Sequence, residues 1–288
     1  MAYLYLTLSA GCSLTVAHFL KLTETRETRS LNTLTVNYLV ALIVAFIVGI
    51  GEGKGDGPII SETGYLLLFC GIIGTLFIAN FLVYGKSVHV NGVGVTITAM
   101  RLSLLIPVVL SILLYGEPLN ILTSAGIILV LGSLLLLIPT QTNLKIRQPH
   151  ISWLLLTTFL LSGLADASLK IYHEDFSMQL NELMFMGFVF VGAFLIGLAA
   201  CLYRGGPLFT KNELLLGGMI GIPNLYSSIF LIYALNGVRG AVAFPIVNTM
   251  NVLGGTFLGL LIWKDQVSFR QWIGITTAIA AILLLVLG

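Results

Sequence analysis

Charged residues are scarce in this chain: 9% of its 288 residues are Asp, Glu, Lys or Arg, whereas 57% are hydrophobic. The mean hydropathy of +1.02 is too high for a water-soluble domain of this size, which could not cover so much apolar surface. Cysteine is also scarce, and Cys12, Cys70 and Cys201 lie within apolar segments without metal-ligand spacing. An odd number of cysteines excludes a complete disulfide framework, so we expect buried, inert thiols.

Several functional classes lack their sequence signatures. There is no HExxH, GxSxG or P-loop motif, and no pair of carboxylates falls within one short motif. The net charge is only +2, and no basic patch with interleaved aromatic residues appears. We therefore expect a protein that is not an enzyme, binds no metal or other cofactor, and has no nucleic-acid partner.

Long apolar runs fill nearly all of the sequence. A helix needs about 20 apolar residues to cross the hydrocarbon core of a bilayer. Runs of that kind lie at 3–21, 31–50, 62–84, 92–115, 121–138, 151–172, 179–203, 213–235, 240–262 and 269–287. The connections between them are too short to bury a core of their own. The sequence predicts an all-α integral membrane protein with ten transmembrane helices, for which the lipid bilayer is the surrounding partner.

Similar residues recur at an offset of 147–149 positions. The recurring pairs include Lys21 and Lys170, Gly71 and Gly218, Gly74 and Gly221, and Glu117 and Asp265. Because five crossings is an odd number, a second copy would cross the membrane in the opposite sense. We expect two inverted five-helix repeats, at 1–140 and 150–288. Secondary transporters built on this plan bind their substrate at the repeat interface near the bilayer midplane.

Basic residues are distributed unevenly among the connections. Ten lysines and arginines lie at or near the connections after odd-numbered runs, and three at or near those after even-numbered runs. The positive-inside rule then places the odd-numbered connections in the cytoplasm and both termini outside.

Arg101 lies near the centre of the fourth run. A charge at this depth costs roughly 2.5–3.5 kcal/mol on insertion scales, so it needs a wet cavity or a partner. A guanidinium fixed there could bind a substrate carboxylate or phosphate bidentately. The alternative is a structural ion pair, with Asp166 as the candidate partner.

Two further ionisable residues are candidates for coupling transport to protons. Asp166 lies four residues before Lys170, a spacing typical of a neutralising helix pair. Asp166 could instead carry a proton. His18 in the first run is either a hydrogen-bonded packing residue or a proton carrier.

Amide, hydroxyl and aromatic side chains recur on single faces of several runs. These candidates for substrate binding are Asn37, Phe77, Asn80, Tyr84, Asn224, Tyr226, Ser227, Asn248 and Asn251. Taken singly, a membrane amide could simply cross-link two helices, which contributes about 0.6 kcal/mol on average. Taken together with Arg101, the polar faces predict the lining of an aqueous cavity. Pro107, Pro223 and Pro245 are expected to interrupt their helices.

The most specific stretch of sequence covers residues 84–138. It contains Gly92, Gly94, Pro107, the turn Tyr115-Gly116-Glu117-Pro118-Leu119, Gly126 and Gly132. With its counterpart around Pro245 and Gly274, this stretch resembles the EamA-type domain of the drug/metabolite transporter superfamily, once in each half. Two positions depart from the family pattern: Lys264-Asp265 replaces the second glycine–glutamate pair, and Arg101 is not a general family feature.

The resemblance implies a secondary transporter that moves a small polar or amphipathic organic metabolite by alternating access. We expect it in the bacterial inner (plasma) membrane. The family is usually drawn with both termini in the cytoplasm, contrary to the charge count. The alternatives are a lipid-head-group flippase and a non-transporting scaffold or partner subunit. The nearly featureless runs 121–138 and 269–287 are expected to face lipid or to form a homodimer.

Overall fold

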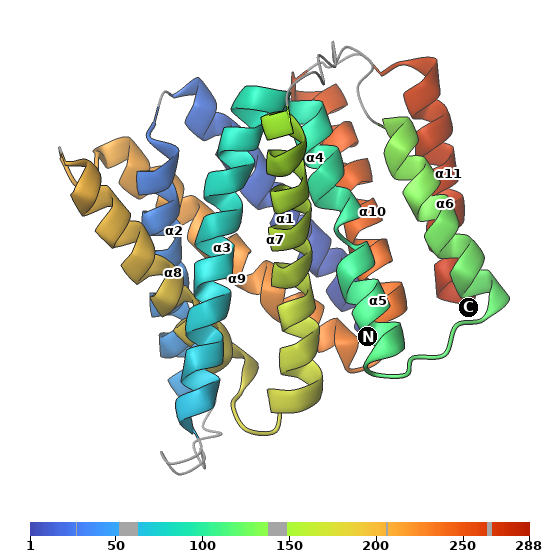
Figure 1. Ribbon diagram of the computed structural model, residues 1–288, viewed down its shortest axis with the longest axis horizontal. Helices are drawn as coiled ribbons and strands as arrows, with labels where there is room; N and C mark the ends of the chain where they lie inside the picture. The colour runs from blue at the N-terminus through green and yellow to red at the C-terminus, as the bar shows by residue number, and fades with distance from the viewer. Residues whose placement is uncertain (27, 52–62, 138–148, 206, 264–266) are drawn as a thin grey trace.

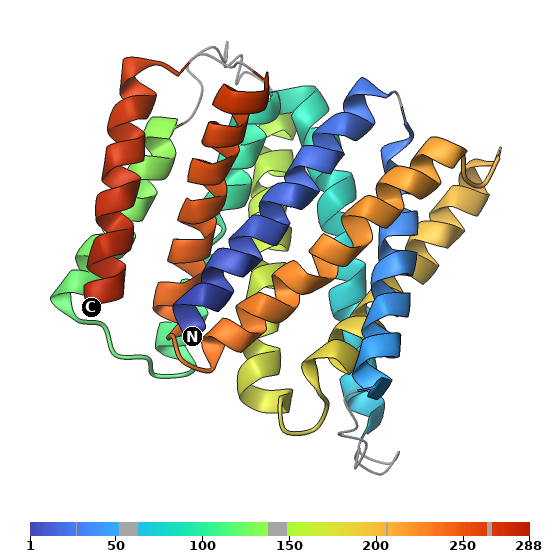
Figure 2. The ribbon, with the colours of Figure 1, turned by 180° about the vertical axis from the view of Figure 1, so that it is seen from behind.

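The computed structural model describes residues 1–288 except 27, 52–62, 138–148, 206 and 264–266. The regular structure of the described part is helical, without strands, and its helices lie side by side in a bundle (Figures 1 and 2). Nine described helical segments are long and apolar enough to cross a membrane, and a shorter apolar helix adds a tenth. The predicted all-α integral membrane protein of about ten helices is confirmed.

Most helices agree with the apolar runs to within about one turn. They are α1 (Ala2–Thr25), α2 (Ser30–Gly51), α3 (Thr63–Asn91), α4 (Val93–Leu102), α5 (Leu105–Leu113), α6 (Ile121–Leu137), α7 (Pro149–Ile171), α8 (Glu182–Arg204), α9 (Lys211–Leu235), α10 (Gly240–Leu258) and α11 (Phe269–Leu287). Short π-helical segments, η1 (Tyr172–Phe176) and η2 (Gly259–Trp263), follow α7 and α10. The exception is α3, which continues to Asn91, about two turns beyond the expected end at residue 84.

The fourth crossing is broken into α4 and α5 at Ser103 and Leu104. Pro107 explains the position of the break, because a proline ring clashes with the carbonyl four residues earlier, which here is Ser103. The Ser103 carbonyl instead accepts a hydrogen bond from the Ile106 amide at 2.9 Å. The expectation that Pro223 and Pro245 interrupt their helices is wrong, because α9 and α10 run through both prolines.

The packing partners of the helices follow a regular pattern. The α1 helix packs on α9 and α10, and α7 packs on α3, α4 and α5. The α2 helix packs on α8 and α9, α3 packs on α8, and α6 packs on α11. Number the crossings in chain order, with α4 and α5 together as the fourth. Exchanging each crossing with the one five later then gives the same set of contacts. A duplication would produce this relation. The division into repeats at 1–140 and 150–288 stays a prediction.

Two helix crossings are close enough to require glycine. A Cβ atom added to Gly74 on α3 would overlap the Val189 carbonyl oxygen of α8 and lie 2.7 Å from the Ala193 amide nitrogen. A Cβ added to Gly221 on α9 would lie 2.8 Å from the Asn37 carbonyl oxygen of α2. Since backbone cannot move aside cheaply, these two glycines hold α3 against α8 and α9 against α2.

Both termini lie at one end of the bundle, which we call the terminal end (Figure 1). The α5–α6 connection (residues 114–120) and the α9–α10 connection (236–239) lie at this end, whereas α1 meets α2 at the opposite end. Which end faces the cytoplasm stays a prediction. Lys54, Lys145, Arg147, Lys264 and Asp265 lie outside the described residues.

The α6 and α11 helices pack closely on each other. A Cβ on Gly126 would overlap Leu285, and one on Gly274 would lie 2.9 Å from Leu137. Their outer faces carry exposed apolar side chains such as Ile128 and Ile279. The homodimer through these helices stays a prediction.

Candidate functional site

A polar chamber lies inside the bundle, where α1, α3, α4, α7, α9 and α10 converge. The lining includes most of the side chains expected from the sequence: Phe77, Asn80, Arg101, Asp166, Asn224, Ser227, Asn248 and Asn251. Tyr38, Phe81, Ser162 and Ser228 contribute to the same wall. Polar residues from helices that are far apart in sequence thus share one cavity.

Arg101, Asp166 and Asn248 form the charged centre of the chamber. The Arg101 guanidinium donates a hydrogen bond from Nη1 to Asn248 Oδ1 at 3.3 Å. The Asp166 carboxyl interacts electrostatically with Arg101 and is within hydrogen-bonding reach of Asn248. The Asn248 amide group donates to the Phe244 carbonyl of its own helix at 3.1 Å, which fixes its orientation. One amide therefore contacts both charges.

Three buried polar atoms of the chamber lining are left without a hydrogen bond. They are Nε of Arg101, a donor, Oδ1 of Asn251, an acceptor, and the Tyr38 hydroxyl; none has a hydrogen-bond partner among the described residues. The Asn251 side chain belongs to a residue that is only 7% exposed. A buried polar group without a partner costs about 1–3 kcal/mol. A bound molecule that offered an acceptor to Arg101 and a donor to Asn251 would offset that cost.

The other polar candidates pair with one another around this centre. Ser162 Oγ donates to Asn80 Oδ1 at 2.8 Å, joining α7 to α3. Asn224 Nδ2 donates to Asn37 Oδ1 at 3.2 Å, joining α9 to α2. Asn37 is fully buried behind the chamber wall, so it positions Asn224.

The two tyrosine candidates differ in their positions. Tyr84 interacts electrostatically with Arg101 from α3, although it is not part of the chamber lining described above. Tyr226 is also not part of the chamber lining described above, and its ring packs on Phe230 at a centroid separation of 5.6 Å. The structure thus brings Tyr84 to the charged centre and does not bring Tyr226 there.

Lys170 does not pair with Asp166, and that expectation is wrong. Lys170 Nζ lies 2.7 Å from Glu117 Oε1 and also contacts Glu174. Lys170 lies one turn closer to the terminal end than Asp166, and its flexible four-carbon stem reaches the acids there. Asp166 is consequently left facing Arg101 in the chamber.

The chamber continues towards the opposite end of the bundle. Arg101 and Asn251 line both the charged centre and this outer part. Further out, His18 and Lys21 of α1 line the passage together with Gln271 of α11. His18 is therefore placed in the passage, apart from the charged centre.

Sequence reasoning missed two lining residues, Ser9 and Ser13 of α1. Ser9 Oγ donates to the Ser227 carbonyl of α9 at 2.7 Å, which ties the two helices together. Their spacing of four residues was the available signal, but a membrane hydroxyl can usually bond to its own helix and thus points weakly to a cavity. Among the described residues, no cluster of three metal-ligating side chains occurs.

Comparison with known proteins gives matches of three kinds. The model of the EamA-like transporter family matches residues 150–287. An uncharacterized protein of Haemophilus influenzae is 25% identical over 284 residues, with 94% of this chain and 93% of that protein covered. One protein crystal structure superposes with a TM-score of 0.75 over 98% of both chains at 14% identity, a likeness that shows the fold alone.

Proposed function

Because the chain belongs to the EamA-like transporter family of the drug/metabolite transporter superfamily, we propose that it is a secondary transporter working by alternating access. The family assignment makes it a membrane transporter of this type. We propose that the cargo is a small polar or amphipathic organic metabolite that binds in the chamber. The chain would be organised as two inverted five-helix repeats in the bacterial inner membrane, with both termini outside.

The unpaired donor and acceptor of the chamber carry this proposal. Arg101 Nε and Asn251 Oδ1 belong to side chains that line the cavity, and both atoms are buried without a hydrogen-bond partner among the described residues. Burying such atoms is costly, and a ligand with complementary groups would offset that cost. The passage that leads from them to the opposite end gives a ligand a route to the site.

The chamber residues take distinct roles in this proposal. Arg101 anchors an anionic or strongly accepting group, and Asn251 accepts a hydrogen bond from a neighbouring N–H or O–H. Phe77 provides an apolar wall beside Arg101. Asn80, Asn224 and Ser227 orient the rest of the molecule. Tyr84 supports Arg101 from α3, and Tyr226 packs on Phe230.

Asp166 is the candidate for coupling to protons. It is the acid that shares the chamber with Arg101, and its carboxyl faces both the guanidinium and Asn248. A proton on Asp166 would weaken its hold on Arg101 and free the guanidinium for the cargo. His18, further out along the passage, is the candidate for delivering that proton.

A thermal-shift screen of the purified protein tests the proposal. Amino acids, nucleosides, sugars and lipid head groups are added one class at a time, and binding raises the melting temperature by mass action. The same screen on Arg101→Gln is the control, because a ligand of the chamber should lose its effect in this variant. A protein that no class stabilises and that transports none of them in liposomes would contradict the proposed function.

A further inference from the structure

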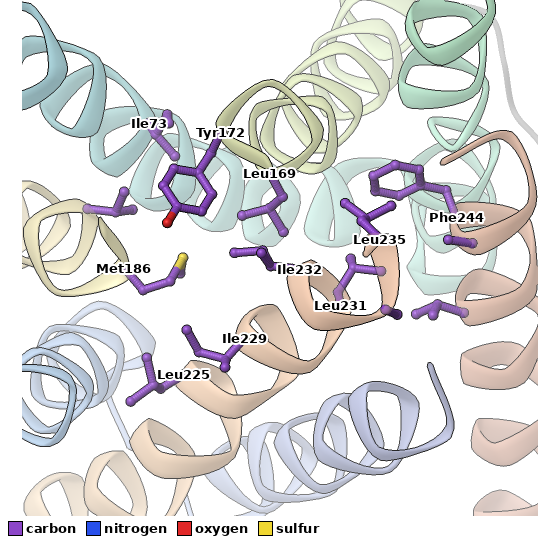
Figure 3. Close-up of a cluster of buried hydrophobic side chains, with 14 of the residues drawn as sticks. Ile73, Leu169, Tyr172, Met186, Leu225, Ile229, Leu231, Ile232, Leu235 and Phe244 are labelled. Carbon is purple, nitrogen blue, oxygen red and sulfur yellow. The ribbon is translucent and has the colours of Figure 1, made fainter. Parts of the chain in front are cut away.

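The chamber is closed at the terminal end by two successive layers. The first is a floor of apolar side chains, Leu169 of α7, Leu231 of α9 and Phe244 of α10, which line the bottom of the chamber and belong to the buried core. Figure 3 shows these side chains gathered with Leu235, which lies one turn further towards the terminal end on α9. An apolar floor of this kind excludes water from the space beneath it.

The second layer is a set of polar contacts centred on Glu117. Its carboxylate oxygens accept hydrogen bonds from the Gly240 and Ala241 amides, each at 2.8 Å, at the start of α10. The same carboxylate accepts the Lys170 ammonium at 2.7 Å. The positive end of the α10 dipole and the lysine charge both favour a carboxylate here. Glu117 thereby fastens the α5–α6 connection to α7 and α10.

Two neighbouring contacts join the same pieces of the chain. Tyr115 OH donates to Asp175 Oδ2 at 2.9 Å, and Arg239 Nη1 donates to the Pro118 carbonyl at 2.7 Å. Burial and the bond to Asp175 raise the pKa of Tyr115, so its phenol stays protonated and keeps donating. Each of these contacts links the α5–α6 connection in the first half of the chain to the second half.

Lys170 is buried to an unusual degree for a lysine. Its side chain is 3% exposed, and the Glu117 side chain is 10% exposed. Replacing a buried ion pair by apolar residues often leaves stability unchanged or increases it, so the pair is a weak stabilising device. A role as a contact that breaks and re-forms during a transport cycle would explain this buried pair, whereas a role in stability does not.

We propose that the Glu117–Lys170 contact is the gate of the terminal end, which holds the chamber closed there while it is open to the opposite end. This inference rests on the proposed transport function and names its moving contact. Opening would separate the α5–α6 connection from α7 and the start of α10, and the floor of Leu169, Leu231 and Phe244 would then part.

A thiol-labelling experiment tests the gate without any substrate. In a background with Cys12, Cys70 and Cys201 replaced by alanine, Leu235→Cys places a reporter one turn beyond the floor residue Leu231, towards the terminal end. The residue is 6% exposed, so a polar maleimide should label it slowly in nanodiscs. Glu117→Gln and Lys170→Met should each raise the labelling rate about tenfold, as expected when a charged hydrogen bond that holds the closed state is lost.

Arg29→Gln is the matched control. Arg29 Nε donates to Glu213 Oε1 at 2.7 Å, and Glu213 is 1% exposed, so this variant also breaks an ion pair with a buried acid. The pair lies at the opposite end, and the labelling rate at position 235 should stay unchanged. Equal rates in all variants, or an equal increase in Arg29→Gln, would overturn the gate.

A cross-link tests the gate if the single variants fail to fold. Tyr115→Cys with Asp175→Cys, joined by a cleavable bifunctional thiol reagent, should abolish both net transport and exchange while ligand binding in the thermal-shift assay persists. Reduction should restore transport. Transport by the cross-linked protein would exclude a gate at this position. A protein that transports nothing but whose labelling responds to Glu117→Gln would instead contradict the proposed cargo transport and leave the gating contact in place.

Discussion

Arg101 and Asn248 are joined by a hydrogen bond across the chamber, with Arg101 Nη1 3.3 Å from Asn248 Oδ1. The two residues come from different halves of the chain, on α4 and α10. The guanidinium is therefore held in one direction, while its Nε has no hydrogen-bond partner among the described residues. A preoriented donor of this kind loses less entropy when it binds a ligand than a mobile one.

Substitution of Arg101 should separate charge from geometry. Arg101→Lys keeps the positive charge but loses the planar fork, so we expect cargo affinity to fall about tenfold or more with the fold preserved, which corresponds to losing one charge-assisted hydrogen bond. Arg101→Gln should lose anion binding altogether. Binding is measured by thermal shift and uptake in liposomes. Full transport by a well-folded Arg101→Gln protein would eliminate the proposed anchor.

Arg101→Gln also removes the positive charge that faces Asp166. If Arg101 serves mainly to neutralise Asp166, Arg101→Gln should lower the melting temperature, and adding Asp166→Asn should restore it. Transport is the second measurement, and we expect it to be lost in the double variant as well, because the anchor for the cargo is missing.

Asp166→Asn should uncouple transport from pH. Asparagine keeps the size of the side chain but cannot take up and release a proton. We expect pH-driven uptake into liposomes to be abolished while substrate exchange continues. Glu182→Gln, at the start of α8 and away from the chamber lining, is the control and should keep the pH dependence. Unchanged pH-driven uptake by Asp166→Asn would rule out Asp166 as the coupling residue.

Gly74→Ala should destabilise the protein, whereas Gly71→Ala, one turn earlier on the same helix, should not. A Cβ at Gly74 overlaps the α8 backbone, but one at Gly71 meets nothing within 4 Å. Overpacking of this kind costs about 1–3 kcal/mol. On α9, Gly221→Ala and Gly218→Ala should differ in the same way, since only Gly221 faces nearby backbone. Thermal unfolding in detergent measures both pairs, and equal melting temperatures within a pair would refute the close crossings.

Two exposed positions allow the orientation to be measured. Met178 is 97% exposed near the terminal end and Tyr203 is 94% exposed at the end of α8, so cysteines at both sites should react without disturbing the fold. If the basic connections are cytoplasmic, an impermeant maleimide applied to intact cells should label Met178→Cys and not Tyr203→Cys. The reverse pattern would restore the orientation in which the family is usually drawn. The 51–61 and 142–148 connections would serve the same purpose, although they lie largely outside the described residues.

The sequence predicted the helices well because apolar length alone determines where a chain can cross a bilayer. It also predicted much of the chamber, since polar side chains on one face of a membrane helix need a wet or paired environment. It could not predict the partner of Lys170, because Glu117 is distant in the chain and only packing brings the two together. Pro107 was expected to interrupt its helix, and the break lies at Ser103 and Leu104, since the ring acts on the carbonyl four residues earlier.

The opposite charges of Arg101 and Asp166 share one chamber, and this bears on how the membrane potential acts on the protein. A potential of 100 mV does about 2.3 kcal/mol of work on each elementary charge that crosses the bilayer. In the proposed alternating-access cycle, a guanidinium and an ionised carboxylate that move together would contribute equal and opposite amounts. The empty protein would then reorient without an electrical penalty in either direction. Current through a reconstituted membrane would therefore report the charge of the cargo and of any proton that travels with it.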